Sequence, residues 1–241
     1  MTNLTFSRSL ALSRCRINPA LAEMGGRALI AWSGESSGYR CVQLDARILD
    51  MRPRLLDRSA RREVAFLLRR AQLDVSGLDL WIPPTHFGDP VHVDRAVGAV
   101  IEAIEFAAEL SGLGVGLTAL AAGGKPAPLG VSVNLGPSPA AGVLDSLAAA
   151  CERHSAGVCD HFWPARMGLL VGVDPDVALA SGVGGGALNA AIAGVSGRIG
   201  SARISEPARK GFDLSLYYAS LDLAGYRGAV VVDTEQIKLR S

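Results

Sequence analysis

The sequence predicts a (β/α)8 barrel, and three observations lead to this fold class. Eight short apolar segments rich in β-branched residues recur along the 241 residues, most of them precede a helical pattern, and the length suits one such barrel. Strands that alternate with helices pair in parallel, because each return crossover usually requires a helix. The predicted strands are residues 4–12, 39–45, 73–82, 131–135, 157–162, 169–173, 198–204 and 229–233.

The strands and helices have distinct patterns. Segments 169–173 and 229–233 are almost continuously apolar, as expected of parallel strands that are buried on both faces. Between strands, apolar residues at three- and four-residue steps predict helices near 64–71, 90–109, 144–151, 177–193 and 213–224. Asp89 and Pro90 are typical of a helix N-cap and first turn, and Gly225 is typical of a helix end.

Two regions depart from the alternation. Residues 163–169 are too few for a helical crossover, so we expect the helix between strands five and six to be missing. Its absence would expose apolar strand surface, which predicts a homo-oligomer or a covering partner. Segment 111–130 is rich in Gly and Ala, and residues 123–128 are typical of a flexible loop.

Composition favours a single cytoplasmic domain over residues 1–241. The net charge of +1 predicts no nucleic-acid partner, and the arginines between positions 52 and 70 accompany an amphipathic helix whose outer face is solvated. The four cysteines have no metal-type spacing and are expected to be reduced. The N-terminal residues lack a signal-peptide pattern, and no apolar run is long enough to span a membrane.

Polar residues gather at the predicted C-terminal ends of the strands, where a (β/α)8 barrel carries its chemistry. Carboxylates and a histidine that converge there are suited to hold a divalent cation, which polarises a sugar carbonyl or hydroxyl. Capping of the following helix is an equal alternative for each aspartate. The set comprises Asp45, Asp79, Trp81, His86 in the loop beyond, Asn134, Asp160, His161, Asp174, Arg203, Glu206 and Asp233.

Three segments resemble the xylose isomerase-like TIM barrels, which include sugar phosphate isomerases and epimerases. Residues 77–84 (GLDLWIPP) with 86–97 (HFGDPVHVDRAV) carry the main likeness. Residues 223–233 (LAGYRGAVVVD) are similar to the last helix and strand of that family, and residues 38–45 (GYRCVQLD) to its second strand. The resemblance follows the strand order along nearly the whole chain and implies a barrel that acts on or binds a small carbohydrate or sugar phosphate.

The resemblance also implies a divalent metal, such as Mn²⁺, Mg²⁺ or Zn²⁺, held by Glu, Asp, His and Glu at the ends of strands five to eight. At those positions this sequence has Trp163, Asp174, Arg203 and Asp233. Two carboxylates thus remain, with Asp160 as a candidate third ligand, and the guanidinium of Arg203 opposes a cation. A barrel without a metal is the alternative, in which Arg203 instead binds a phosphate or carboxylate.

Three functions remain open at this point. The first is a sugar isomerase or epimerase, with metal ligands Asp174, Asp233 and Asp160 and with His161, Asp45 or His86 in proton transfer. Arg203, Trp81, Asn134 and Trp163 are then the candidate substrate-binding residues. The second is a catalytically inactive, metal-free barrel that binds a ligand or a protein. The third is another reaction on the same scaffold, such as hydrolysis or lyase chemistry. An Arg203 ion pair between Asp174 and Asp233 would favour the second.

Overall fold

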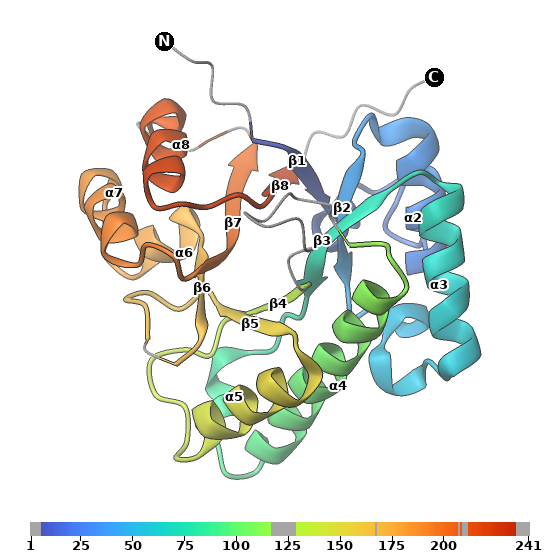
Figure 1. Cartoon of the computed structure of the whole chain (residues 1–241), viewed down its shortest axis with the longest axis horizontal. Helices are drawn as coiled ribbons and strands as arrows, with labels where there is room; N and C mark the ends of the chain where they lie inside the picture. The colour runs from blue at the N-terminus through green and yellow to red at the C-terminus, as the bar shows by residue number, and fades with distance from the viewer. Residues whose placement is uncertain (1–5, 117–128, 167, 207, 209–211, 235–241) are drawn as a thin grey trace.

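A computed structural model describes residues 6–116, 129–166, 168–206, 208 and 212–234, and its strands form a closed barrel (Figure 1). The eight strands are all parallel and neighbour one another in sequence order, with β8 paired to β1. The predicted (β/α)8 barrel is therefore confirmed. The strands are β1 (Arg8–Ala11), β2 (Cys41–Asp45), β3 (Asp74–Asp79), β4 (Gly130–Val133), β5 (Gly157–Asp160), β6 (Leu170–Val173), β7 (Ile199–Glu206) and β8 (Val230–Thr234).

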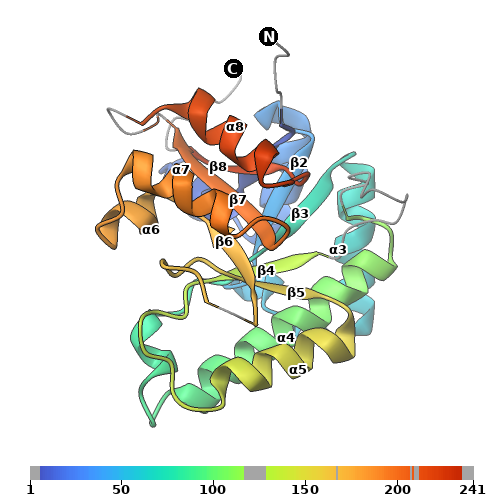
Figure 2. The same ribbon diagram turned by 60° about the vertical axis from the view of Figure 1, so that its left-hand side comes forward.

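Helices surround the barrel, and Figure 2 shows α4 beside α5 on one side and α7 beside α8 on another. The α-helices are α1 (Leu12–Cys15), α2 (Gly26–Trp32), α3 (Arg58–Arg70), α4 (Val93–Gly112), α5 (Val143–His154), α6 (Pro175–Ala180), α7 (Gly185–Gly194) and α8 (Leu214–Leu223). Four shorter helical turns are η1 (Ser33–Ser37), η2 (Leu49–Met51), η3 (Pro53–Leu55) and η4 (Pro84–Phe87). In the described part of the chain, no helix is long and apolar enough to cross a membrane.

Two helix predictions need correction. The long helix begins at Val93 rather than at Pro90, because the Asp89 carboxylate accepts hydrogen bonds from the backbone of Val91 and the ring of His92 in a preceding turn. The helix predicted over 177–193 is two helices, α6 and α7. Gly182 separates them with a φ of +85°, a left-handed conformation that ends an α-helix.

The hydrophobic core has two parts. One cluster packs residues of β1–β5 against α2–α5, and a smaller one packs β6–β8 against α6–α8. Trp163, which follows β5, is buried in the smaller cluster together with Val171 and Tyr217. The barrel is thus held on both sides of its β5–β6 junction.

The connection from β5 to β6 has no helix among its described residues, as predicted. The expected exposed apolar face is nevertheless wrong, because Val158, Val171 and Val173 are each at most 1% exposed. Arg166 lies over the ring of Phe162 at 4.3 Å from its centroid, so the loop packs on itself beside the strands. An exposed apolar face beside β5 therefore no longer supports a homo-oligomer. The homo-oligomer itself stays a prediction. The loop predicted at 123–128 lies outside the described residues.

Candidate functional site

The C-terminal mouth of the barrel holds a pocket of about 730 Å³. Its walls come from the loops after most of the strands, and Trp81, which is 52% exposed, stands among them. Ten of its lining residues are polar or charged, and these are Ser13, Arg14, Arg47, Asp79, Asn134, Asp174, Asp176, Ser181, Arg203 and Asp233. The predicted convergence of strand-end side chains at one mouth therefore holds for most of the set.

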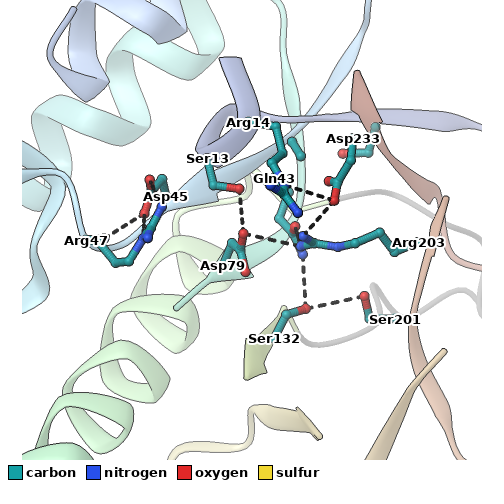
Figure 3. Close-up of polar contacts among 12 residues, drawn as sticks. Ser13, Arg14, Gln43, Asp45, Arg47, Asp79, Ser132, Ser201, Arg203 and Asp233 are labelled. Carbon is teal, nitrogen blue, oxygen red and sulfur yellow. Dashed lines mark hydrogen bonds and ion pairs between the residues drawn. The ribbon is translucent and has the colours of Figure 1, made fainter. Parts of the chain in front are cut away.

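Arg203 is the centre of the site (Figure 3). Its guanidinium reaches from β7 across the mouth, with Nη2 3.3 Å from Asp79 Oδ2 and Nη1 3.3 Å from Asp233 Oδ2. Ser13 donates a further hydrogen bond to Asp79, and Arg14 Nε lies 3.3 Å from the same Asp233 oxygen. One ion network thus joins residues at or next to the ends of β1, β3, β7 and β8.

A hydrogen-bonded chain continues from Arg203 into the barrel interior. Arg203 donates to Gln43 Oε1, Gln43 Nε2 donates to Ser132 Oγ at 3.0 Å, and Ser132 donates to Ser201 Oγ at 3.3 Å (Figure 3). All four side chains are buried. They keep Arg203 in a single orientation, because buried polar groups retain stability only when they are paired.

Burial and the network set the charges of the site. Burial alone would lower the pKa of Arg203, but the carboxylates of Asp79, Asp233 and Asp174 outweigh it and raise this pKa. Burial would raise the pKa of Asp79, yet Arg203 and the Ser13 hydrogen bond bring it below its usual range. The pKa of Asp233 is raised by burial, with only partial compensation by Arg203 and Arg14. The pKa shifts of Asp79 and Asp233 thus have opposite signs, and Asp233 is the less fully paired carboxylate, because its Oδ1 is buried with no hydrogen-bond partner among the described residues.

The carboxylates predicted to bind a metal are engaged otherwise. Asp174 caps α6 by accepting from the backbone N–H groups of Asp176 and Val177, and burial raises its pKa. Asp160 accepts from Arg166 at 2.8 Å and from the backbone of Leu135. In the described chain, no three His, Cys, Asp or Glu side chains are grouped to hold a metal ion.

A divalent cation does not fit this arrangement. Asp233, the remaining candidate ligand on β8, pairs with a permanently charged guanidinium, and a cation beside it would be repelled by that charge. The ion pair joins Asp233 to Asp79 rather than to Asp174, which was the expected second partner. Arg203, which is itself at one of the four implied ligand positions, thus places a permanent positive charge next to Asp233.

The other predicted residues divide into two groups. Trp81 and Asn134 line the mouth pocket, and Asn134 Oδ1 accepts from the backbone of Gly136. Asp45 is buried and binds Arg47 through both carboxylate oxygens. The ring of His86 stacks on that of His92, with their centroids 4.4 Å apart. Neither His86 nor Trp163 is among the residues that line the pocket.

His161 directly follows β5 and is 6% exposed. Both of its ring nitrogens are buried without a hydrogen-bond partner in the described structure. Burial, with the Arg203 charge in addition, lowers the pKa of His161 to about 3, although Asp79 opposes this shift. The imidazole is therefore neutral at physiological pH and has an unused donor and an unused acceptor.

Sequence reasoning gave no role to Gln43 and Ser132 and placed Asp79 among the strand ends without a partner. The roles of Gln43 and Ser132 could have been inferred from the alternation of side chains between the two faces of a strand. Gln43 lies two residues before Asp45 in an otherwise apolar strand, and Ser132 lies between two valines, so each polar side chain faces the barrel interior. Which side chains meet across the barrel depended on the strand register and was not readable from the chain.

The comparisons agree with this architecture. No family model matches the sequence, and no curated protein matches it by sequence. The resemblance that the sequence motifs indicated holds for the fold, because solved structures of sugar epimerases share this closed parallel barrel. A crystal structure of D-psicose 3-epimerase in the presence of D-fructose matches 96% of this chain and 86% of its own, with a TM-score of 0.66 and 9% identity.

Two further solved structures share the fold. A D-tagatose 3-epimerase-like protein has a TM-score of 0.61 and 12% identity, covering 95% of this chain and 90% of that one. The probable 3-DHS dehydratase AsbF from Bacillus anthracis, described as involved in petrobactin synthesis, has a TM-score of 0.56 and 12% identity, covering 96% and 93%. The chain thus shares its fold with these proteins, and the likeness concerns the fold alone.

Proposed function

We propose that this protein binds a small neutral carbohydrate in the mouth pocket without a metal ion. One observation supports this most directly. Arg203 Nε and Asp233 Oδ1 are buried beside the pocket with no hydrogen-bond partner among the described residues. A buried polar atom without a partner destabilises a protein by about 1–3 kcal/mol, so such atoms usually indicate a ligand or ordered water. Sugar hydroxyls both donate and accept, and because this pair has almost no accessible surface, a hydroxyl reaches it when the side chains of Arg203 and Asp233 shift on binding.

The charge of the pocket favours a neutral ligand over a phosphate. Three arginines line it, and each already has a carboxylate partner: Arg14 pairs with Asp233, Arg47 with Asp45 and Arg203 with Asp79. A phosphate would have to share these arginines with their carboxylates, whose negative charge weakens its binding. The half-exposed ring of Trp81 offers an apolar face to the C–H surface of a sugar ring.

Calorimetric titration in EDTA tests the proposal, with the ketohexoses D-psicose and D-fructose, the polyol D-glucitol and fructose 6-phosphate. We expect a neutral sugar to bind, the phosphate to bind more weakly, and EDTA to have no effect. Trp81→Ala should weaken binding about tenfold or more. Leu223→Ala is the control, because Leu223 is 83% exposed at the end of α8 and is not among the residues that line the pocket.

Two results would contradict the proposal. If none of the neutral sugars bound at millimolar concentration, the pocket would have another occupant. If a sugar bound only after Mn²⁺, Mg²⁺ or Zn²⁺ was added, the metal-dependent alternative would be correct, and Arg203 would have to move away from Asp233.

A further inference from the structure

A small chamber of about 40 Å³ adjoins the mouth pocket. It shares Asp79, Trp81, Asn134, Asp174 and Arg203 with that pocket, whereas His161 and Ser132 line the chamber alone. A ligand in the mouth therefore has access to a deeper recess. One water molecule takes up about 30 Å³ in the liquid, so the recess has room for a group of that size.

His161 forms one wall of this chamber, and the backbone holds it in place. Its N–H donates to Val133 O at 2.7 Å, which continues the β4–β5 pairing by one residue. Its ring lies against Gly172 on β6, where an added Cβ would be only 2.4 Å from Cδ2 and Nε2 of the imidazole. The absence of a side chain at position 172 thus makes the space that the ring fills.

The chemistry of this wall is incomplete. Ring nitrogens that are buried and unpaired reduce stability, and a phenyl ring in the same space would avoid that penalty. A histidine here destabilises the empty protein, which indicates that it serves a bound group. A neutral imidazole offers one donor and one acceptor. Both ring nitrogens have almost no accessible surface, so a hydroxyl in the chamber pairs with one of them only after the ring turns toward the chamber.

We propose that the chamber receives a terminal hydroxymethyl group of the sugar and that His161 hydrogen-bonds its hydroxyl. This inference rests on the proposed function and adds the ligand class: a sugar whose inserted end carries a free hydroxyl and no phosphate. The chamber has room for about one hydroxyl group, and its wall holds the two carboxylates of Asp79 and Asp174 against the single guanidinium of Arg203, so its net charge disfavours an anion. His161 acts as a specificity-determining residue.

The experiment compares His161→Phe with the wild-type protein and with His92→Phe. The latter makes the same exchange at a ring that is partly exposed and lies outside both cavities. Dissociation constants are measured for D-psicose and for its 1-deoxy and 6-deoxy analogues. We expect the wild-type protein and His92→Phe to prefer D-psicose at least tenfold over one of the two analogues. In His161→Phe this preference should disappear, while thermal stability is unchanged or higher.

A second measurement separates this role from a structural one. In protein labelled with ¹⁵N-histidine, the ring nitrogen signals that are missing from His161→Phe belong to His161, and D-psicose should shift at least one of them. Undiminished discrimination by His161→Phe, or unmoved His161 signals at saturation, would overturn the inference alone. Failure of the wild-type protein to bind any neutral sugar would instead overturn the proposed function and this inference with it.

Discussion

Replacing His161 with Phe is expected to remove a large part of the acid sensitivity of this fold. An unfolded chain binds a proton at His161 with a pKa near 6.5, whereas the folded protein does so only at about 3. The folded-state pKa is thus depressed, and its contribution to stability is present above pH 6.5 and is lost as the pH falls toward 3. From pH 7.5 to 5.0 the loss amounts to about 2 kcal/mol, at 1.36 kcal/mol for each pH unit below 6.5.

Urea unfolding followed by circular dichroism at pH 7.5 and 5.0 measures this quantity. The wild-type protein should lose about 2 kcal/mol more unfolding free energy than His161→Phe, because the aspartates and the other histidines titrate in both proteins and cancel in the difference. His92→Phe should behave as the wild type does. An equal loss in the wild-type protein and in His161→Phe would mean that the buried imidazole accepts a proton in the folded state, and the reasoning would fail.

Three further predictions concern the same mouth. Arg203→Met leaves the Asp79 carboxylate buried without its main partner and should lower the unfolding free energy by about 3–5 kcal/mol. A double-mutant cycle with Asp79→Asn tests the pairing, which is contradicted if Arg203→Met costs as much in the Asp79→Asn protein as in the wild type. Gly172→Ala should cost about 1–3 kcal/mol through overpacking against His161, and less than half of that when His161 is also Ala. Asp174→Ala should lower the unfolding free energy by about 1 kcal/mol, because the cap of α6 is lost. Asp174→Asn keeps a capping oxygen and should stay within about 0.5 kcal/mol of the wild type. Thermal unfolding measures both variants.

The capping role of Asp174 illustrates how far local sequence reaches. An aspartate followed by proline at the end of an apolar strand predicts both a barrel-mouth position and a helix N-cap, and the structure has both. Local sequence also predicted the eight strands and the missing helix between β5 and β6, because strand patterns and crossover lengths are set by residues close together in the chain.

The partners of Arg203 were not determined in this way. Sequence position suggested Asp174 and Asp233, and the tertiary structure chose Asp79 and Asp233, since β3 and β8 bring their carboxylates within 3.3 Å of the guanidinium. The prediction of an exposed apolar face beside β5 was wrong for a related reason. Its covering depends on how the 161–169 loop packs, and not on whether that segment is helical.

The sequence by itself determined the barrel, the order of its strands and the mouth as the place of chemistry, because apolar periodicity and turn residues act over a few positions. Only the tertiary structure decided that the guanidinium of Arg203 pairs with Asp79 and Asp233 and that His161 lies unpaired against Gly172. Those contacts join residues more than ten positions apart across a closed barrel. Register, shear and burial set them, and no local pattern in the chain records these quantities.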